Sequence, residues 1–228
     1  GSVGLITYMR TDSVRISEEA RTAGNQFIEE HFGKNYLPAK PRYYKTKASA
    51  QDGHEAIRPT VISLTPAMAK PSLTSEQYKL YKLIWERFMA SLMAACIQST
   101  QSIDISAADY IFRASGYTVK FDGYTAVYSS AKDEDEEGES VLPPLAEGDI
   151  LVLRDLAGNQ HFTLPPARYN DATLIDVMEK TGIGRPSTYA PTITTIIARR
   201  YVAKEGKNLY MTEIGEVVNN IMKESFPA

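Results

Sequence analysis

Two residues near the start of the chain, Tyr8 and Arg10, have types and spacing that suit an attack on a phosphate. A tyrosine hydroxyl is a weak nucleophile at its usual pKa of about 10, and a neighbouring cation favours its phenolate form. An arginine guanidinium is permanently charged, and its fork matches the oxygens of a phosphate. In an extended backbone the two side chains would point the same way. The pair suits phosphoryl transfer, although the same spacing is also common on ordinary surfaces.

A second segment, residues 54–60 (HEAIRPT), contains a histidine and another arginine. An imidazole can share a proton or donate to a phosphate near neutral pH, and Arg58 adds a second phosphate-shaped cation. A purely structural role for His54 remains open. No second histidine follows four residues later, as a zinc protease would require. The three histidines are scattered and Cys96 is the single cysteine, so we expect no zinc site and no internal disulfide.

A third segment, Gly-Ile-Gly-Arg-Pro-Ser-Thr-Tyr, ends at Tyr189. Gly184 would let a phosphate approach the backbone, and Arg185 supplies charge. Ser187 and Thr188 lie at an expected helix start, where free N–H groups attract anions. The ring of Tyr189 could stack on a base or a sugar. A well-made turn with a helix cap explains the same residues equally well.

The charge pattern is uneven. A net charge of −3 weighs mildly against a nucleic-acid partner, but much of the acid sits in residues 133–137, while basic residues gather at 42–47 and 199–207. The acidic run is most simply a solvated loop tip. No apolar run is long enough to span a membrane and no signal peptide is visible, so we expect a cytoplasmic protein.

The elements that would hold these segments differ along the chain. Up to about residue 95 the pattern predicts helices, one capped by Ser17 and ending near Gly33, and one with a Thr74–Gln77 capping box. Spacings of three and four in the second helix predict a core-facing stripe: Tyr78, Tyr81, Trp85, Phe88 and Leu92. A Lys/Arg/Tyr-rich loop lies between the two helices.

Residues 96–165 have the alternation of β-strands. The predicted strands are residues 102–106, 117–121, 125–128 and 149–153.

Residues 166–228 predict a winged helix-turn-helix. A helix through Thr181 capped by Asn170 or Asp171, a glycine turn, a helix from about Ser187, a hairpin (201–203 with 209–211) and a final amphipathic helix follow in order.

Together these motifs resemble a known family. Residues 4–13 (GLITYMRTDS) closely resemble the active-site signature of bacterial DNA topoisomerase I, a type IA topoisomerase. Residues 54–60 and 182–190 resemble two further signatures of that family, in the same order. Met9 stands where topoisomerase III of the same type usually has proline, which favours the topoisomerase I branch.

The resemblance implies roles for particular residues. Tyr8 matches the nucleophile that forms a 5′-phosphotyrosyl bond, Arg10 the arginine at the scissile phosphate, and His54 a histidine that supports the site and contacts DNA. The other expected DNA contacts are Asp12, Ser13, Arg58, Gly184, Arg185, Ser187, Thr188 and Tyr189.

The resemblance also implies parts that this sequence does not contain. Nothing in it resembles the family's Toprim domain, which binds Mg²⁺, and the zinc-ribbon modules are absent. We therefore expect a fragment of the enzyme, with Mg²⁺ bound by the missing Toprim domain and no metal bound by this chain.

The expected fold is α+β, with mainly helical, winged-helix-like DNA-binding domains joined by an antiparallel β segment, as part of a toroidal enzyme. The expected domains are 1–95 (nucleophile), 96–165 (β-rich hinge) and 166–228 (single-strand binding). The expected enzyme is a monomeric, nucleoid-associated isomerase that relaxes negatively supercoiled DNA without ATP, through single-strand cleavage, strand passage and religation. The fragment alone is expected to be inactive. The alternatives are a non-enzymatic winged-helix DNA-binding protein and an interaction module with incidental motifs.

Overall fold

The computed structural model describes residues 4–11, 13–44, 53–128 and 141–226. Contacts divide the chain into two compact units, Gly1–Leu151 and Val152–Ala228. The β-rich hairpin therefore belongs to the same unit as the first helices. The three-domain division at residues 95 and 165 stays a prediction.

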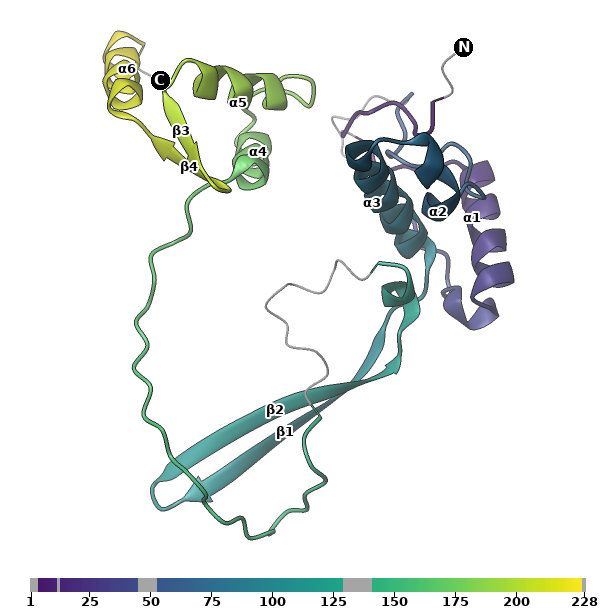
Figure 1. Cartoon of the computed structure of the whole chain (residues 1–228), viewed down its shortest axis with the longest axis vertical. Helices are drawn as coiled ribbons and strands as arrows, with labels where there is room; N and C mark the ends of the chain where they lie inside the picture. Colours follow the sequence, from purple (N-terminus) through teal and green to yellow (C-terminus); the bar gives the residue numbers. More distant parts are fainter. Residues whose placement is uncertain (1–3, 12, 45–52, 129–140, 227–228) are drawn as a thin grey trace. The chain divides into compact units, whose positions relative to one another are not determined.

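Helices and strands are mixed, as the α+β class predicts (Figure 1). Within the described residues, the first unit contains α1 (Glu18–His31), α2 (Pro66–Ala69), α3 (Ser75–Leu92), β1 (Ile97–Ala107), β2 (Tyr110–Phe121) and the 3₁₀ turns η1 (Lys34–Tyr36), η2 (Lys70–Ser72) and η3 (Gly123–Ala126). The second contains α4 (Asp171–Lys180), α5 (Tyr189–Ala198), β3 (Val202–Glu205), β4 (Asn208–Met211) and α6 (Glu213–Ser225).

The two long helices of the first unit begin where the sequence predicts. Ser17 accepts a hydrogen bond from the Ala20 amide at the start of α1, and Thr74 forms a reciprocal capping box with Gln77 at the start of α3. These side chains occupy backbone N–H groups that a helix leaves without partners in its first turn. Both predicted caps are confirmed.

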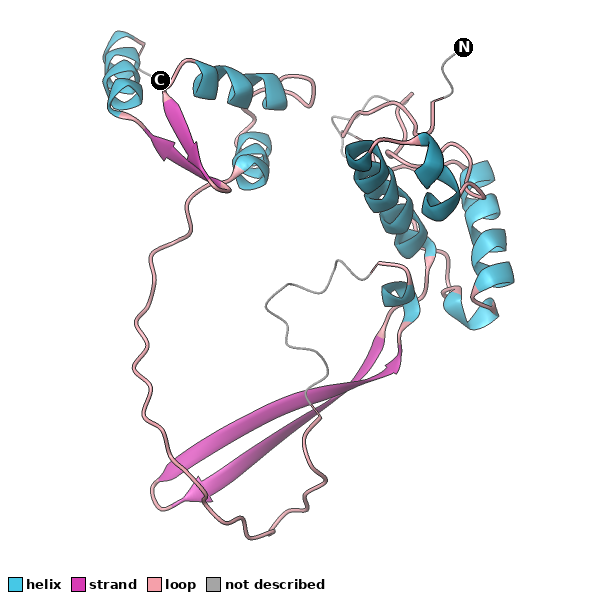
Figure 2. Cartoon of the chain, in the orientation of Figure 1, coloured by secondary structure: helices cyan, strands magenta, loops and turns pink. Residues whose placement is uncertain are grey.

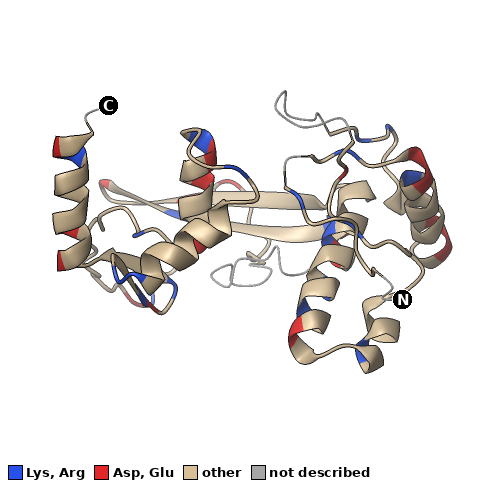
Figure 3. Cartoon of the chain, turned by 90° about the horizontal axis from the view of Figure 1, so that it is seen from above, with Lys and Arg blue, Asp and Glu red and all other residues tan. Residues whose placement is uncertain are grey.

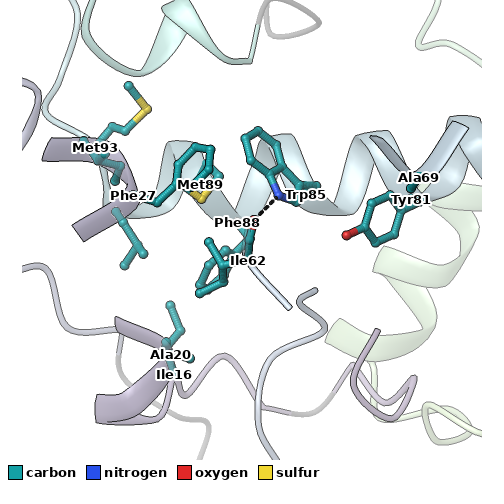
Figure 4. Packing of buried hydrophobic residues seen from close by; sticks show 12 residues of the cluster. Ile16, Ala20, Phe27, Ile62, Ala69, Tyr81, Trp85, Phe88, Met89 and Met93 are labelled. Carbon is teal, nitrogen blue, oxygen red and sulfur yellow. Dashed lines mark hydrogen bonds between the residues drawn. The ribbon is translucent and has the colours of Figure 1, made fainter. Parts of the chain in front are cut away.

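The core of the first unit lies between α1 and α3 (Figure 4). The aromatic stripe of α3 points into it: Tyr81, Trp85, Phe88 and Leu92 are buried. Trp85 donates its indole N–H to the Ile62 carbonyl oxygen at 3.0 Å, which satisfies its one polar atom in the core. The prediction that this stripe packs inward is confirmed for these four residues. It is wrong for Tyr78, which is half-buried and lies outside the core cluster, with the Lys70 ammonium 5.3 Å from its ring centroid.

A long two-stranded hairpin follows α3 (Figure 2). β1 and β2 pair antiparallel from Gln98 opposite Val119 to Ala107 opposite Tyr110, so the strands predicted at 102–106 and 117–121 are confirmed and extended.

Two predicted strands are wrong. Residues 125–128 belong to the turn around η3, where local bonds such as Val127 N–H to the Tyr124 carbonyl replace a ladder. Residues 149–153 have no regular structure, because the described residues offer them no strand to pair with. The acidic run at 133–137 lies outside the described residues.

The root of the hairpin is tied to the helical part of the same unit. The Tyr36 hydroxyl donates to Asp122 at 2.7 Å, and this bond, together with the carboxylate's charge, raises the pKa of Tyr36. The Tyr124 amide donates to the Ala94 carbonyl at 2.9 Å. Gly123 has a φ of +52°, and a Cβ there would lie 2.6 Å from the Ala94 oxygen, so the close approach requires glycine.

The second unit has the predicted order of a winged helix: helix, glycine turn, helix, β-hairpin, helix. Asn170 caps α4 through a capping box with Thr173. α5 begins at Tyr189, slightly later than predicted, because Arg185 to Thr188 form a turn of their own. The final helix α6 is amphipathic as expected, but Ile214, Val217, Ile221 and Met222 on it are more than half exposed.

Close packing of α6 on Tyr201, the residue just before β3, generates a test. A Cβ added at Gly215 would lie 2.0 Å from the Tyr201 carbonyl oxygen, a backbone atom that cannot rotate away. We expect Gly215→Ala to destabilise the second unit by about 1–3 kcal/mol, in the range of overpacking substitutions. Hydrogen–deuterium exchange of the β3 and β4 amides measures this loss. Gly158→Ala is the control, because a Cβ there meets nothing within 4 Å. Equal exchange in the two variants would contradict the prediction.

Candidate active site

The segments around Tyr8 and His54 lie side by side in the first unit. The Thr7 amide donates to the Arg58 carbonyl at 2.9 Å, and the Thr60 amide donates to the Leu5 carbonyl at 3.0 Å. Between these bonds Ile6 and Pro59 form an antiparallel bridge. Two sequence motifs that are far apart in the chain are therefore joined by main-chain pairing.

Threonine hydroxyls complete this pairing. The Thr7 hydroxyl donates to the Ala56 carbonyl at 2.8 Å and accepts from the Arg58 amide at 3.0 Å. The Thr60 hydroxyl donates to the Gly4 carbonyl at 2.7 Å. Thr7 precedes Tyr8 directly, so these bonds fix the backbone from which the candidate nucleophile projects.

His54 lies close to both Tyr8 and Arg10. An Nη1 of Arg10 is 3.5 Å from Nε2 of His54, and the ring centroids of Tyr8 and His54 are 6.4 Å apart. The Arg10 amide donates to the Tyr8 carbonyl at 2.9 Å, so the backbone turns at Met9 and is not extended as the spacing argument assumed. The three predicted catalytic residues are nevertheless brought together.

The phenol of Tyr8 is open to solvent. Its side chain is 76% exposed, and Arg10 beside it is half-buried. An exposed phenol near a guanidinium and an imidazole can attack an electrophile from solution, and the cation can stabilise negative charge that develops on a phosphate. The arrangement is chemically suited to phosphoryl transfer with a tyrosine nucleophile.

Arg58 is used differently from what the sequence predicted. Its Nε and Nη2 donate to the two carboxylate oxygens of Glu55 at 3.0 and 3.1 Å, and its Nη1 donates to the Pro59 carbonyl at 3.0 Å. The side chain is only 13% exposed. A guanidinium with these three acceptors holds its own loop in shape, so the predicted DNA contact of Arg58 gains no support. Glu55 was not among the predicted site residues, although its i,i+3 spacing to Arg58 is visible in the sequence.

The end of the first motif also faces inward. Ser13 is 4% exposed, and its hydroxyl oxygen accepts from the Arg15 amide at 3.2 Å. The Arg15 carbonyl in turn accepts from the Ala56 amide at 2.8 Å. Ser13 thus supports the backbone of the site, and its buried hydroxyl is not open to DNA. Asp12, also predicted to contact DNA, lies outside the described residues.

The glycine segment belongs to the second unit and is built as a tight turn. Gly184 has a φ of +78°, and the Arg185 amide donates to the Thr188 hydroxyl at 2.8 Å. Arg185 and Ser187 are exposed, as a strand-contacting loop requires. Tyr189 is 8% exposed, and a Cβ on Gly184 would lie 3.3 Å from its ring. The ring is therefore packed under the turn, so base stacking by Tyr189 gains no support and stays a prediction.

Comparison with known proteins identifies the family. A family model described as DNA topoisomerase matches residues 2–228. This chain belongs to the DNA topoisomerase family. It is similar to the solved structure of full-length topoisomerase I from Thermotoga maritima, with 35% sequence identity and a TM-score of 0.80. The match covers 99% of this chain and 36% of the Thermotoga chain, so this topoisomerase chain spans little more than a third of that enzyme's length.

Among the described residues, no three His, Cys, Asp or Glu side chains gather as a metal site would require. Figure 3 shows Lys and Arg in both units, on loops as well as on helices. No helix in the described part of the chain is long and apolar enough to cross a membrane.

The pairing of the two motifs generates a second test. Thr7→Val leaves the Ala56 carbonyl and the Arg58 amide without their partner, and each unsatisfied polar group costs about 1–3 kcal/mol when buried. We expect the first unit to lose about 1–3 kcal/mol of stability, in urea unfolding followed by emission of Trp85, the single tryptophan. Thr22→Val, at an exposed position on α1, is the control and should change stability by less than about 0.5 kcal/mol. Equal losses in both would show that the two bonds of the Thr7 hydroxyl contribute nothing to stability.

Proposed function

We propose that this chain is the nucleophile-bearing part of a type IA DNA topoisomerase that relaxes negatively supercoiled DNA. The observation that carries the proposal is the gathering of the exposed Tyr8 phenol, His54 and Arg10 from two paired segments. The family membership and the similarity to an intact topoisomerase I support it. The partner is single-stranded DNA, and the enzyme acts as a cytoplasmic, nucleoid-associated monomer.

The reaction is a transesterification. The Tyr8 oxygen forms a bond to the phosphorus of one strand while the bond from phosphorus to the 3′-oxygen breaks. The phenol gives its proton to solvent, and the departing oxygen takes one up to become a 3′-hydroxyl. The 5′-phosphate stays on Tyr8. After the other strand has passed, the 3′-hydroxyl attacks the phosphotyrosine and restores the original bond. One phosphodiester replaces another, so no ATP is consumed.

The residues around Tyr8 have separate roles. Arg10 stabilises the charge that builds up on the phosphoryl oxygens. His54 donates to the phosphate and keeps Arg10 in reach through their 3.5 Å contact. Glu55 and Arg58 position the loop that carries His54 and do not touch the reacting atoms. In the second unit, Arg185, Ser187, Thr188 and Gly184 form the turn that contacts the single strand.

The proposed enzyme uses Mg²⁺, but the described residues of this chain do not fit a magnesium site, because they gather no three acidic or imidazole groups. We assign the metal to the Toprim domain, outside this chain, and no step above runs through it.

Covalent capture tests the role of Tyr8. In the complete enzyme, Tyr8→Phe removes the hydroxyl oxygen that is proposed to bond to phosphorus, so no protein–DNA adduct should form. The measurement uses a labelled single-stranded oligonucleotide with Mg²⁺, stopped with SDS and resolved on a denaturing gel. Tyr110→Phe changes another tyrosine that is 72% exposed and should leave the adduct unchanged. An adduct of normal yield with Tyr8→Phe would assign the nucleophile to another residue.

The chain alone is expected to bind single-stranded DNA and to leave negatively supercoiled plasmid unrelaxed in the presence of Mg²⁺. Relaxation by the chain alone would refute the need for a further domain.

The winged-helix order of the second unit favours one rival, a duplex-reading DNA-binding protein without enzymatic activity. Competition between single-stranded and duplex oligonucleotides for the chain separates the two. Preference for a particular duplex sequence would support the rival.

A further inference from the structure

Tyr43 is an exposed tyrosine whose ring packs against Arg21, a buried arginine of α1. The side chain of Tyr43 is 69% exposed, and the guanidinium carbon of Arg21 lies 4.5 Å from the centroid of its ring. Arg21 itself is 7% exposed, although it carries a permanent charge. One face of the ring therefore rests on a cation that the fold keeps out of water.

The backbone on both sides of Tyr43 is pinned. Nη1 of Arg21 donates to the Arg42 carbonyl at 2.7 Å, just before the ring. The Tyr44 hydroxyl donates to the Ser91 carbonyl at 2.7 Å, just after it, and so ties the segment to the end of α3. Glu18 approaches Nε of Arg21 at 3.8 Å and helps to hold the buried cation in place.

These hydrogen bonds fix the backbone around a ring that is exposed to solvent. Exposed aromatic rings that only fill surface space need no anchor, whereas a ring that stacks on a ligand gains from being held rigid before binding. The pinned segment also keeps the ring where it is without burying it in the core between α1 and α3.

The surroundings of the ring are basic. Lys40 and Arg42 next to it are exposed, and the sequence from residue 31 to residue 51 contains no aspartate or glutamate. Flat rings flanked by cations are the pattern with which proteins hold single strands, because every base offers a π face and every linkage a phosphate.

We propose that Tyr43, supported by the buried Arg21 and flanked by Lys40 and Arg42, binds single-stranded nucleic acid with one base stacked on its outer face; these four residues are here named the Tyr43 platform. The phosphates beside that base lie against Arg42 and Lys40. This inference rests on the proposed function in one respect: the bound strand is the single-stranded DNA that the enzyme cleaves and reseals. It adds a contact in the helical part of the first unit, separate from Tyr8 and from the turn at Arg185.

The test is a binding titration of the 228-residue chain with a fluorescent thymidine oligonucleotide, followed by anisotropy at low salt. Tyr43→Leu keeps an apolar side chain but removes the π face, and it should weaken binding about 5- to 100-fold, as expected for one lost stacked base. Tyr43→Phe keeps the ring and should bind within about twofold of the natural chain, as stacking on any aromatic face predicts. The matched control is Tyr110→Leu, another exposed tyrosine, next to Asp109.

A second readout does not depend on affinity. An oligonucleotide carrying 5-iodouracil, irradiated on the chain, should crosslink to the peptide that contains Tyr43. Arg42→Gln should lower the slope of log affinity against log salt by about one phosphate contact. Emission of Trp85 verifies that each variant is folded. Normal binding by Tyr43→Leu, or crosslinks only to other peptides, would overturn the proposal. So would an equal loss for single-stranded and duplex DNA, because stacking requires an unpaired base.

The two proposals fail separately. If Tyr43→Leu binds normally while Tyr8→Phe abolishes the covalent adduct, the platform is wrong and the proposed function stands. If Tyr43→Leu weakens binding while Tyr8→Phe still forms adducts, the platform stands and the nucleophile is wrong.

Discussion

The candidate site depends on the main-chain pairing between residues 4–7 and residues 56–60. Thr7 and Ala56, which are joined by a hydroxyl–carbonyl bond, lie 49 positions apart in the chain. Tyr8 directly follows the first paired segment, and His54 lies two residues before the second. In a β-type pairing, a slip of one residue would send alternate side chains to the opposite face, so the register decides whether a phenol and an imidazole meet. The hydroxyl of Thr7, which both donates and accepts, opposes such a slip.

Three arginines in the first unit show how the same side chain takes on unlike roles. Arg58 is enclosed by Glu55 and a carbonyl, and it shapes a loop. Arg21 is buried beneath an aromatic ring and holds it outward. Arg10 lies beside the imidazole of His54. Charge alone does not distinguish them, because the guanidinium is charged in every case. The acceptors and rings around each one determine which can meet a phosphate.

The helical part and the hairpin of the first unit meet at a junction held by contacts between residues far apart in the chain. Tyr36 reaches Asp122, 86 positions later, and Gly123 passes against the carbonyls that follow α3. A side chain at Gly123 would collide with that backbone, so the turn into η3 requires glycine at this position. Residues 97–121 can therefore form a long hairpin whose root is fixed while most of its length is solvated.

What the sequence by itself determined were the features whose hydrogen bonds close within a few residues. Ser17, Thr74 and Asn170 could be recognised as caps because each bonds an amide three positions ahead. The motif around Tyr8 named the candidate nucleophile, and the helical spacing of Trp85 and Phe88 predicted two residues of the core. Tertiary structure alone decided the rest, because long-range partners set it. Residues 149–153 alternate like a strand but have no described neighbour to pair with. The ring of Tyr189 packs against Gly184, and the guanidinium of Arg58 bonds to Glu55. Such outcomes depend on which groups meet across the fold, and spacing along the chain does not encode that.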